Sequence, residues 1–101
     1  MEDMTPIRRK RTIKEAIEAM PAAIRTGEKL QLKIREAEGD VLLLADLMVE
    51  AIAMNRLSRC LSHVDRNGKE LVSIEGLQSA YCMDLARDGY LRARKSNRAQ
   101  P

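Results

Sequence analysis

The segment from Asp40 to about His63 constrains the fold of this chain more than any other. It predicts one long helix, apolar nearly all round over its first half, where only Asp46 and Glu50 interrupt residues 41–54. That run falls well short of the roughly 20 apolar residues that cross a bilayer, so we expect a core helix. In a chain of 101 residues, little other material is left to cover it. The pattern therefore favours a homodimer or a partner protein on this helix, and the alternative is that flanking helices cover it.

Composition assigns the rest of the core to aliphatic side chains. The chain is 45% hydrophobic and 33% charged, with two Tyr and no Phe or Trp. A core of Leu, Ile, Val, Met and Ala without large aromatic residues is more typical of packed helices than of sheets. We therefore predict an all-α fold, a small helical bundle with the long apolar helix at its centre. The length fits one domain at residues 12–91, between a basic N-terminal arm at 1–11 and a basic, disordered tail at 92–101.

A first helix is predicted to begin at Thr12. Thr12 and Glu15 form the T-x-x-E pattern of a capping box. Ile13, Ile17 and Met20 then make one apolar stripe. Pro21 predicts a kink or a new helical turn, and residues 26–27 are expected to close the segment.

Residues 29–35 fit two patterns. Apolar and polar side chains alternate there as in a strand, yet the residue types are good helix formers. We favour a helix, and the alternative is a short β-hairpin that pairs residues 29–35 with residues 69–74. Asp40 is a suitable N-cap for the helix that follows.

The last third of the chain contains a turn and a final helix. Asn67 and Gly68 favour a tight turn within residues 65–69. Ser73 can cap a helix that starts near residue 74. Gly89, followed by Tyr90, is typical of a helix C-cap, which predicts that the helix ends before residue 92.

Positive charge gathers at both ends of the chain. Residues 1–13 have a net charge of +2 and residues 87–101 a net charge of +4, whereas residues 14–86 have a net charge of −3. Such arms can neutralise phosphates or meet an acidic partner. The candidate contact residues are Arg8, Arg9, Lys10, Arg11, Arg92, Arg94, Lys95 and Arg98.

Asp46 and Glu50 form a candidate acidic stripe. Positions four apart share one side of a helix, so the two carboxylates can steer a basic partner surface toward it. The alternative is that this side is simply the solvent-exposed face.

No metal or cofactor is expected. Residues 65–77 resemble the calcium loop of the EF-hand family, with Asp65 and Asn67 at matching positions. Lys69 occupies a ligand position, however, and Gly76 replaces the closing glutamate, so the oxygen ligands are lost. Cys60 and Cys82 lack metal-ligand spacing and are expected to be free thiols.

Nothing in the sequence predicts catalysis. His63 is the one histidine, and we expect it to interact with the dipole at the end of the long helix. Cys60 lies three residues before it, but no carboxylate stands at an orienting position. We therefore expect a non-enzymatic protein.

The functional expectation is a small adaptor or inhibitor that binds another protein. Its size and lack of catalytic groups match the type of phage or mobile-element protein that blocks a host nucleoprotein complex, as anti-CRISPR proteins do. The alternative is a small nucleic-acid-binding transcriptional regulator that uses the basic arms. The N-terminus lacks the basic start and apolar run of a signal peptide, so we expect a cytoplasmic protein without a membrane segment.

Overall fold

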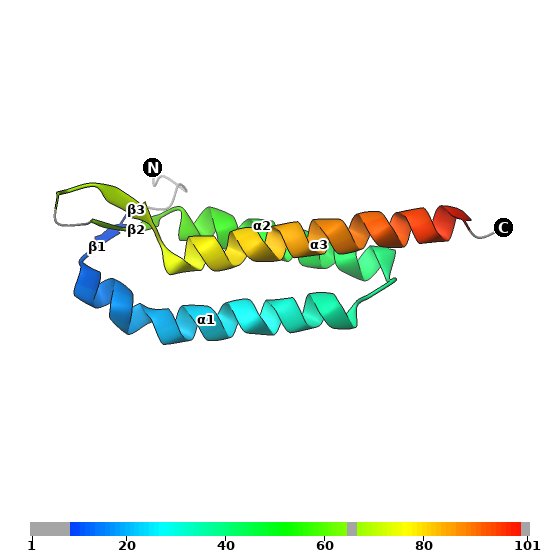
Figure 1. The fold of residues 1–101 in the computed structure, drawn as a ribbon, viewed down its shortest axis with the longest axis horizontal. Helices are drawn as coiled ribbons and strands as arrows, with labels where there is room; N and C mark the ends of the chain where they lie inside the picture. Colours follow the sequence, from blue (N-terminus) through cyan, green and yellow to red (C-terminus); the bar gives the residue numbers. More distant parts are fainter. Residues whose placement is uncertain (1–8, 65–66, 100–101) are drawn as a thin grey trace, which may run out of the picture.

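The chain folds as a small all-α bundle with a short sheet at one end (Figure 1). This is a computed structural model, and it describes the backbone at residues 9–64 and 67–99 and the side chains at residues 10–61, 67–69 and 71–96. In chain order the elements are β1 (Arg9–Arg11), α1 (Ile13–Glu36), α2 (Val41–Ser58), β2 (Leu61–Val64), β3 (Glu70–Val72) and α3 (Ile74–Ala99).

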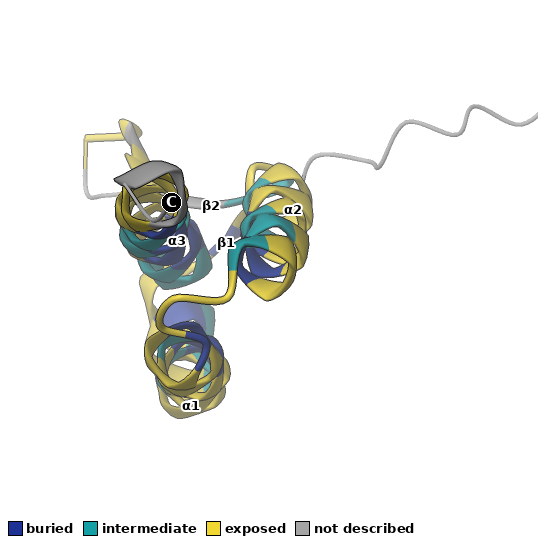
Figure 2. Cartoon of the chain, turned by 90° about the vertical axis from the view of Figure 1, so that its right-hand side faces the viewer, coloured by how far each residue is buried: buried dark blue, intermediate teal, exposed yellow. Residues whose placement is uncertain are grey.

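Helix α3 is the centre of the bundle. It runs parallel to α1 and antiparallel to α2 and packs on both, whereas α1 and α2 contact each other little (Figures 1 and 2). The prediction of a small all-α bundle is confirmed. The apolar helix, however, is neither the longest nor the central one, because α2 has 18 residues and lies on one side of α3.

The buried face of α3 consists of small side chains. Ser79, Cys82, Ala86 and Ala93 are buried and recur three, four and seven residues apart, which places them on one face of the helix. Gly89 lies on the same face, and a Cβ there would stand 3.3 Å from Leu44 of α2. Small residues thus let both neighbouring helices approach α3 closely.

Three helix starts are capped as predicted. Thr12 Oγ1 accepts a hydrogen bond from Glu15 N at 3.2 Å, and Glu15 Oε1 accepts one from Thr12 N at 3.2 Å, which completes the capping box. Asp40 Oδ1 accepts from Leu43 N at 3.0 Å. Ser73 Oγ accepts from Gly76 N at 3.1 Å. These short-range signals are confirmed because each depends only on residues within one turn.

Helix α1 is continuous over 24 residues, so the predicted break near Gly27 is wrong. Gly27 is buried inside the helix, and the side chain of Gln78 occupies the space that a Cβ would need. Pro21 also lies inside α1, with eight helical residues before the proline and 15 after it. Residues 29–35 are helical as favoured, and the alternative hairpin with residues 69–74 is wrong because β3 pairs with β2 instead.

Two of the three strands of the sheet, β1 and β2, come from segments that were predicted as an arm and a helix end. β2 pairs in parallel with β1, with Arg11 opposite His63, and antiparallel with β3, with Ser62 opposite Val72. The expected helix-end position of His63 is therefore wrong, because α2 ends at Ser58 and the chain turns into β2. Gly68, at φ 79°, provides the left-handed backbone of the hairpin turn.

Helix α3 continues past Gly89 to Ala99, so the expected C-cap and the disordered tail from residue 92 are wrong. Gly89 is half-buried in the contact with Leu44 and does not have a positive φ. Ala93, one turn further on, is 4% exposed and belongs to the core, which holds the helix together beyond the glycine. Residues 100–101 lie outside the described part of the chain.

Enlarging the small face of α3 should destabilise the bundle. Ala86 is fully buried, so Ala86→Leu should lower the free energy of unfolding by about 1–3 kcal/mol. Ala80→Leu, on the exposed side of the same helix, should change it by less than about 0.5 kcal/mol. Urea denaturation of the two variants measures the difference, and equal effects would contradict the close packing of α3.

The two thiols should differ in reactivity. Burial raises the pKa of the Cys82 thiol, whose Sγ lies 3.6 Å from the carbonyl oxygen of Gly27. The thiol therefore stays protonated and shielded in the folded state at pH values where an exposed thiol begins to ionise. Cys60 is only half-buried. A thiol reagent should modify Cys60 first and Cys82 only on unfolding, and comparable rates at both would be the opposite result.

Candidate protein interface

Arg11 is a structural residue and not a free cation. Its Nη1 and Nη2 donate to Glu75 Oε2 and Oε1 at 2.9 and 2.7 Å, a two-pronged ion pair between β1 and α3. The side chain is 7% exposed, and the hydrogen bond with Glu75 raises the pKa of the guanidinium. Its predicted role as a contact residue is therefore corrected, because burial and pairing leave it unavailable to a partner.

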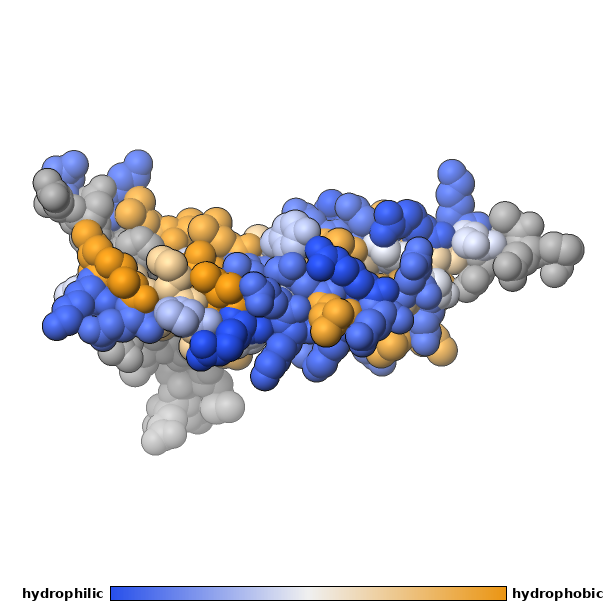
Figure 3. All heavy atoms as spheres, turned by 60° about the horizontal axis from the view of Figure 1, so that its bottom comes forward, coloured by the Kyte–Doolittle hydropathy of each residue, from blue (hydrophilic) through white to orange (hydrophobic). Residues whose placement is uncertain are grey.

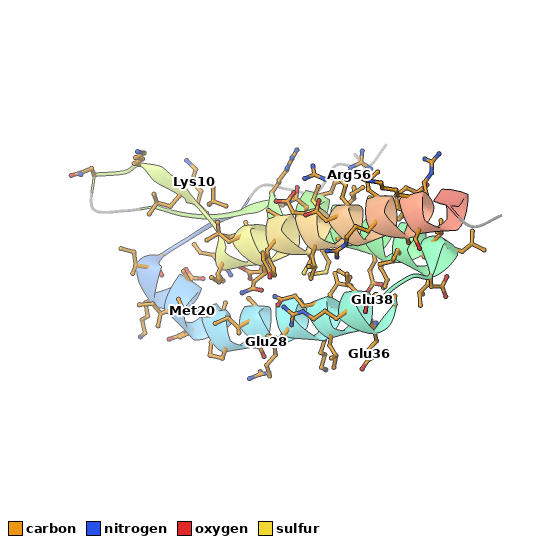
Figure 4. All side chains as sticks on the ribbon, turned by 45° about the vertical axis from the view of Figure 1, so that its right-hand side comes forward. Lys10, Met20, Glu28, Glu36, Glu38 and Arg56 are labelled. Carbon is orange, nitrogen blue, oxygen red and sulfur yellow. The ribbon has the colours of Figure 1, made fainter. Side chains whose placement is uncertain are left out.

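Of the other predicted contact residues in the N-terminal arm, the structure describes the side chain of one. Lys10 is exposed and projects from β1, beside the sheet (Figure 4). Arg9 is described in its backbone only, and Arg8 lies outside the described residues. Among the described residues, Lys10 of β1 and the basic residues near the end of α3 do not form one surface, since β1 and the end of α3 lie at opposite ends of the molecule (Figure 1).

The C-terminal half of α3 carries exposed basic side chains on several sides. Arg92, Arg94 and Lys95 are exposed, and Arg94 Cζ lies 5.9 Å from the centre of the Tyr90 ring. At about 100° per residue, Arg92 and Lys95 lie about 60° apart on one face, whereas Arg94 points about 160° away from Arg92, so the three do not make a single stripe along a nucleic-acid backbone. The side chain of Arg98 is outside the described part.

A groove of about 450 Å³ opens where the α1–α2 connection meets α3. Ile34, Leu44 and Leu85 form its apolar wall, and Arg35 and Arg92 are among its other lining residues. Both guanidinium groups belong to exposed residues. The groove has the size of a ligand pocket, but its polar groups do not form a recognisable catalytic arrangement.

Hydroxyl groups gather where α2 meets α3, and they link helices to each other. Ser79 Oγ donates to Gly76 O at 3.0 Å and accepts from Asn55 Nδ2 at 3.0 Å. Ser58 Oγ donates to Asn55 O at 2.7 Å, and Ser73 Oγ lies 3.4 Å from Ser58 O. These groups are engaged with the backbone and with one another, which is a structural network.

Apolar side chains are exposed along the first half of α1. Ile13, Ile17 and Met20, which we call the α1 patch, are 46%, 59% and 39% exposed. The sequence marks them as one stripe, and the structure places that stripe beside the buried face of α1 and not within it. Figure 3 shows apolar side chains gathered at the sheet end of this side of the molecule, with hydrophilic ones over most of the rest.

Helix α2 has a second apolar face. Its buried residues point to α3, and the opposite side is exposed, with Leu42 at 80% and Val49 and Leu57 each at 64%. We call this side the outer stripe of α2. It consists of Leu42, Ala45, Val49, Ile52, Ala53 and Leu57.

The two carboxylates of the predicted acidic stripe lie in different environments. Glu50 Oε1 lies 3.8 Å from Lys33 Nζ, so it faces α1. Asp46 is exposed on the outer side of α2, and no charged side chain in the described ranges pairs with it. Arg56, which is also exposed on α2, was not predicted as a candidate interface residue. The sequence signal that could have identified it is its charge, opposite in sign to that of Asp46, ten residues further along the same apolar helix.

The described residues contain no group of three or more His, Cys, Asp or Glu side chains arranged to hold a metal ion. Cys60 is half-buried, and His63 is described only in its backbone, so the structure does not place that pair's side chains together. None of the helices in residues 9–64 and 67–99 combines the length and the apolar character needed to span a bilayer.

Comparison with protein-family models finds no match to this chain, and comparisons with curated proteins and with solved structures give no significant match. The candidate interface is therefore argued from its own geometry.

Removing the buried cation should test its structural role. Arg11→Met should lower the free energy of unfolding by about 1–3 kcal/mol, because a part-buried carboxylate loses a two-pronged charged partner. The double variant Arg11→Met with Glu75→Gln should lose less than the sum of the two single variants. Denaturant titrations of the four proteins measure this coupling, and strictly additive losses would show that the pair contributes nothing.

Proposed function

We propose that this chain is a small non-enzymatic adaptor or inhibitor that acts by binding another protein. The observation that supports the proposal most is that small side chains fill the core while large apolar side chains lie on the surface. The buried hydrophobic residues include seven small ones, six Ala and Cys82, while the exposed large hydrophobics number fourteen among the described residues. Large exposed apolar patches of this kind mark interaction surfaces.

The shape of the molecule supports the same proposal. Its dimensions are 58 × 35 × 20 Å, so it is thin for its length. A thin bundle with small side chains inside has little interior volume in which to bury larger ones. Apolar side chains therefore remain available to a partner after the chain has folded.

We assign partner binding to the α1 patch. Ile13, Ile17 and Met20 follow the i, i+4, i+7 spacing of a helix that lies against an apolar surface. Ile24 continues the stripe by one more turn. No charged residue interrupts the stripe between Ile13 and Ile24 on that side of the helix. The matching partner is a protein with an apolar surface. A nucleoprotein complex of a host cell, blocked in the manner of small phage or mobile-element inhibitors, is the class of target we propose.

The second candidate function is nucleic-acid binding by the C-terminal end of α3. It is favoured by one observation, that this end projects from the bundle as a helix with Arg92, Arg94 and Lys95 exposed (Figure 1). These charges are spread around the helix and do not form one stripe, so nucleic-acid binding has weaker support than the protein partner proposed for the α1 patch.

A capture experiment with matched variants distinguishes the two functions. The tagged chain is incubated with lysate of the host cell, with and without nuclease. Capture should survive nuclease, should be lost in Ile17→Glu, and should persist in Leu32→Glu, which changes a similarly exposed apolar residue elsewhere on α1. If the captured material disappears with nuclease and with deletion of residues 92–101, nucleic-acid binding is the function and the proposal is wrong.

A further inference from the structure

The outer stripe of α2 has the spacing of a helix that packs against another helix. Leu42, Val49 and Ala53 recur seven and four residues apart and point away from α3. The buried face of the same helix consists of Leu44, Leu47, Ala51 and Ser58. Helix α2 is thus apolar on two opposite faces, and α3 covers one of them.

Two opposite charges lie within this apolar surface, and their order along the helix determines how two copies of the surface can pair. Asp46 stands in the first half of α2 and Arg56 near its end, about 15 Å apart along the axis at 1.5 Å per residue. Both are exposed, and neither forms an ion pair with a described side chain. Arg56 points to the side of the bundle away from α1 (Figure 4). Ten residues bring a helix to within about 80° of its starting direction, so both charges lie on the exposed side of α2 that carries the apolar stripe.

That order makes the surface complementary to itself in one orientation only. In a parallel pair of α2 helices in register, Asp46 would meet Asp46 and Arg56 would meet Arg56, which is repulsive. In an antiparallel pair centred on Ala51, each Asp46 stands at the level of Arg56 in the other copy. A two-fold axis then creates the same ion pair twice.

The same register also matches side-chain sizes. With Ala51 at the centre, Val49 lies at the level of Ala53 in the other copy, and Leu57 lies at the level of Ala45. Two of the four large side chains on the stripe therefore face a small one, which favours close approach of the two helices there. The order of the charges and these two large–small pairs share the same centre.

We propose that the outer stripe of α2 binds a second copy of this chain, antiparallel and centred on Ala51, with Asp46 of each copy paired to Arg56 of the other. This surface is distinct from the α1 patch. The dimer consequently leaves both copies of that patch free and presents them as a bivalent surface.

Mass measurements test the surface. Light scattering over a wide concentration range should give twice the monomer mass of 11.4 kDa. Val49→Glu should give the monomer with an unchanged circular dichroism spectrum, because the side chain is 64% exposed in the isolated chain. Leu32→Glu and Ile17→Glu should remain dimeric. A monomeric native chain, or a Val49→Glu protein that stays dimeric, would overturn the proposal.

Charge reversal tests the orientation. Asp46→Arg alone and Arg56→Asp alone should each weaken the dimer roughly tenfold to a hundredfold, because each creates two like-charge contacts. An equimolar mixture of these two variants should form heterodimers, since both contacts between the copies then join an arginine to an aspartate. The double variant should dimerise like the native chain. Failure of the mixture to associate would rule out the antiparallel register.

These results are separable from the proposed function. Loss of capture in Ile17→Glu with an intact dimer would support the partner site alone. A monomeric native chain that still captures its partner would overturn only the inference about α2.

Discussion

The close approach of α3 to both of its neighbours is the constraint on which the rest of the structure depends. Ser79, Cys82 and Ala86 are each fully buried on that helix. Because none of them is large, the axes of α1 and α2 can come near α3 with few side chains between them. Hydrogen bonds to Gly76 and Asn55 then satisfy the buried hydroxyl of Ser79. Packing at small residues thus replaces the aromatic core that this composition does not provide.

This kind of core determines what is left on the surface. Leu44 is almost completely buried, whereas Leu42 and Val49 of the same helix remain exposed. The apolar surplus is concentrated on two faces, the α1 patch and the outer stripe of α2. One face is uninterrupted by charge and the other contains a charge of each sign. That difference is the reason for assigning the first to a partner protein and the second to self-association.

Signals that act within one helical turn could be predicted from the sequence. The caps at Thr12, Asp40 and Ser73 and the helical state of residues 29–35 are confirmed because neighbouring residues determine them. The predicted helix ends at two glycines were wrong, because contacts with distant residues decide the structure there. Gly27 and Gly89 look like helix ends in the sequence, yet each is a contact point, against Gln78 and Leu44 respectively.

The site was predictable to a similar extent. The basic and acidic residues could be named, but their partners could not. Arg11 looks like part of a free arm until Glu75, 64 residues away, is seen to bind it. Whether an apolar stripe is core or surface depends on which face meets another helix, as the exposure of Ile17 shows. Local composition does not contain that information, because it is fixed by the packing of α3.

The order of the elements has a consequence for how the chain becomes structured during synthesis. Helices α1 and α2 leave the ribosome first, but they contact each other little, and their apolar faces meet only when the last quarter of the chain arrives. The first two helices therefore cannot complete a core before α3 has left the ribosome. A ribosome that stalled before residue 74 would hold a polypeptide with its core residues exposed to chaperones and proteases.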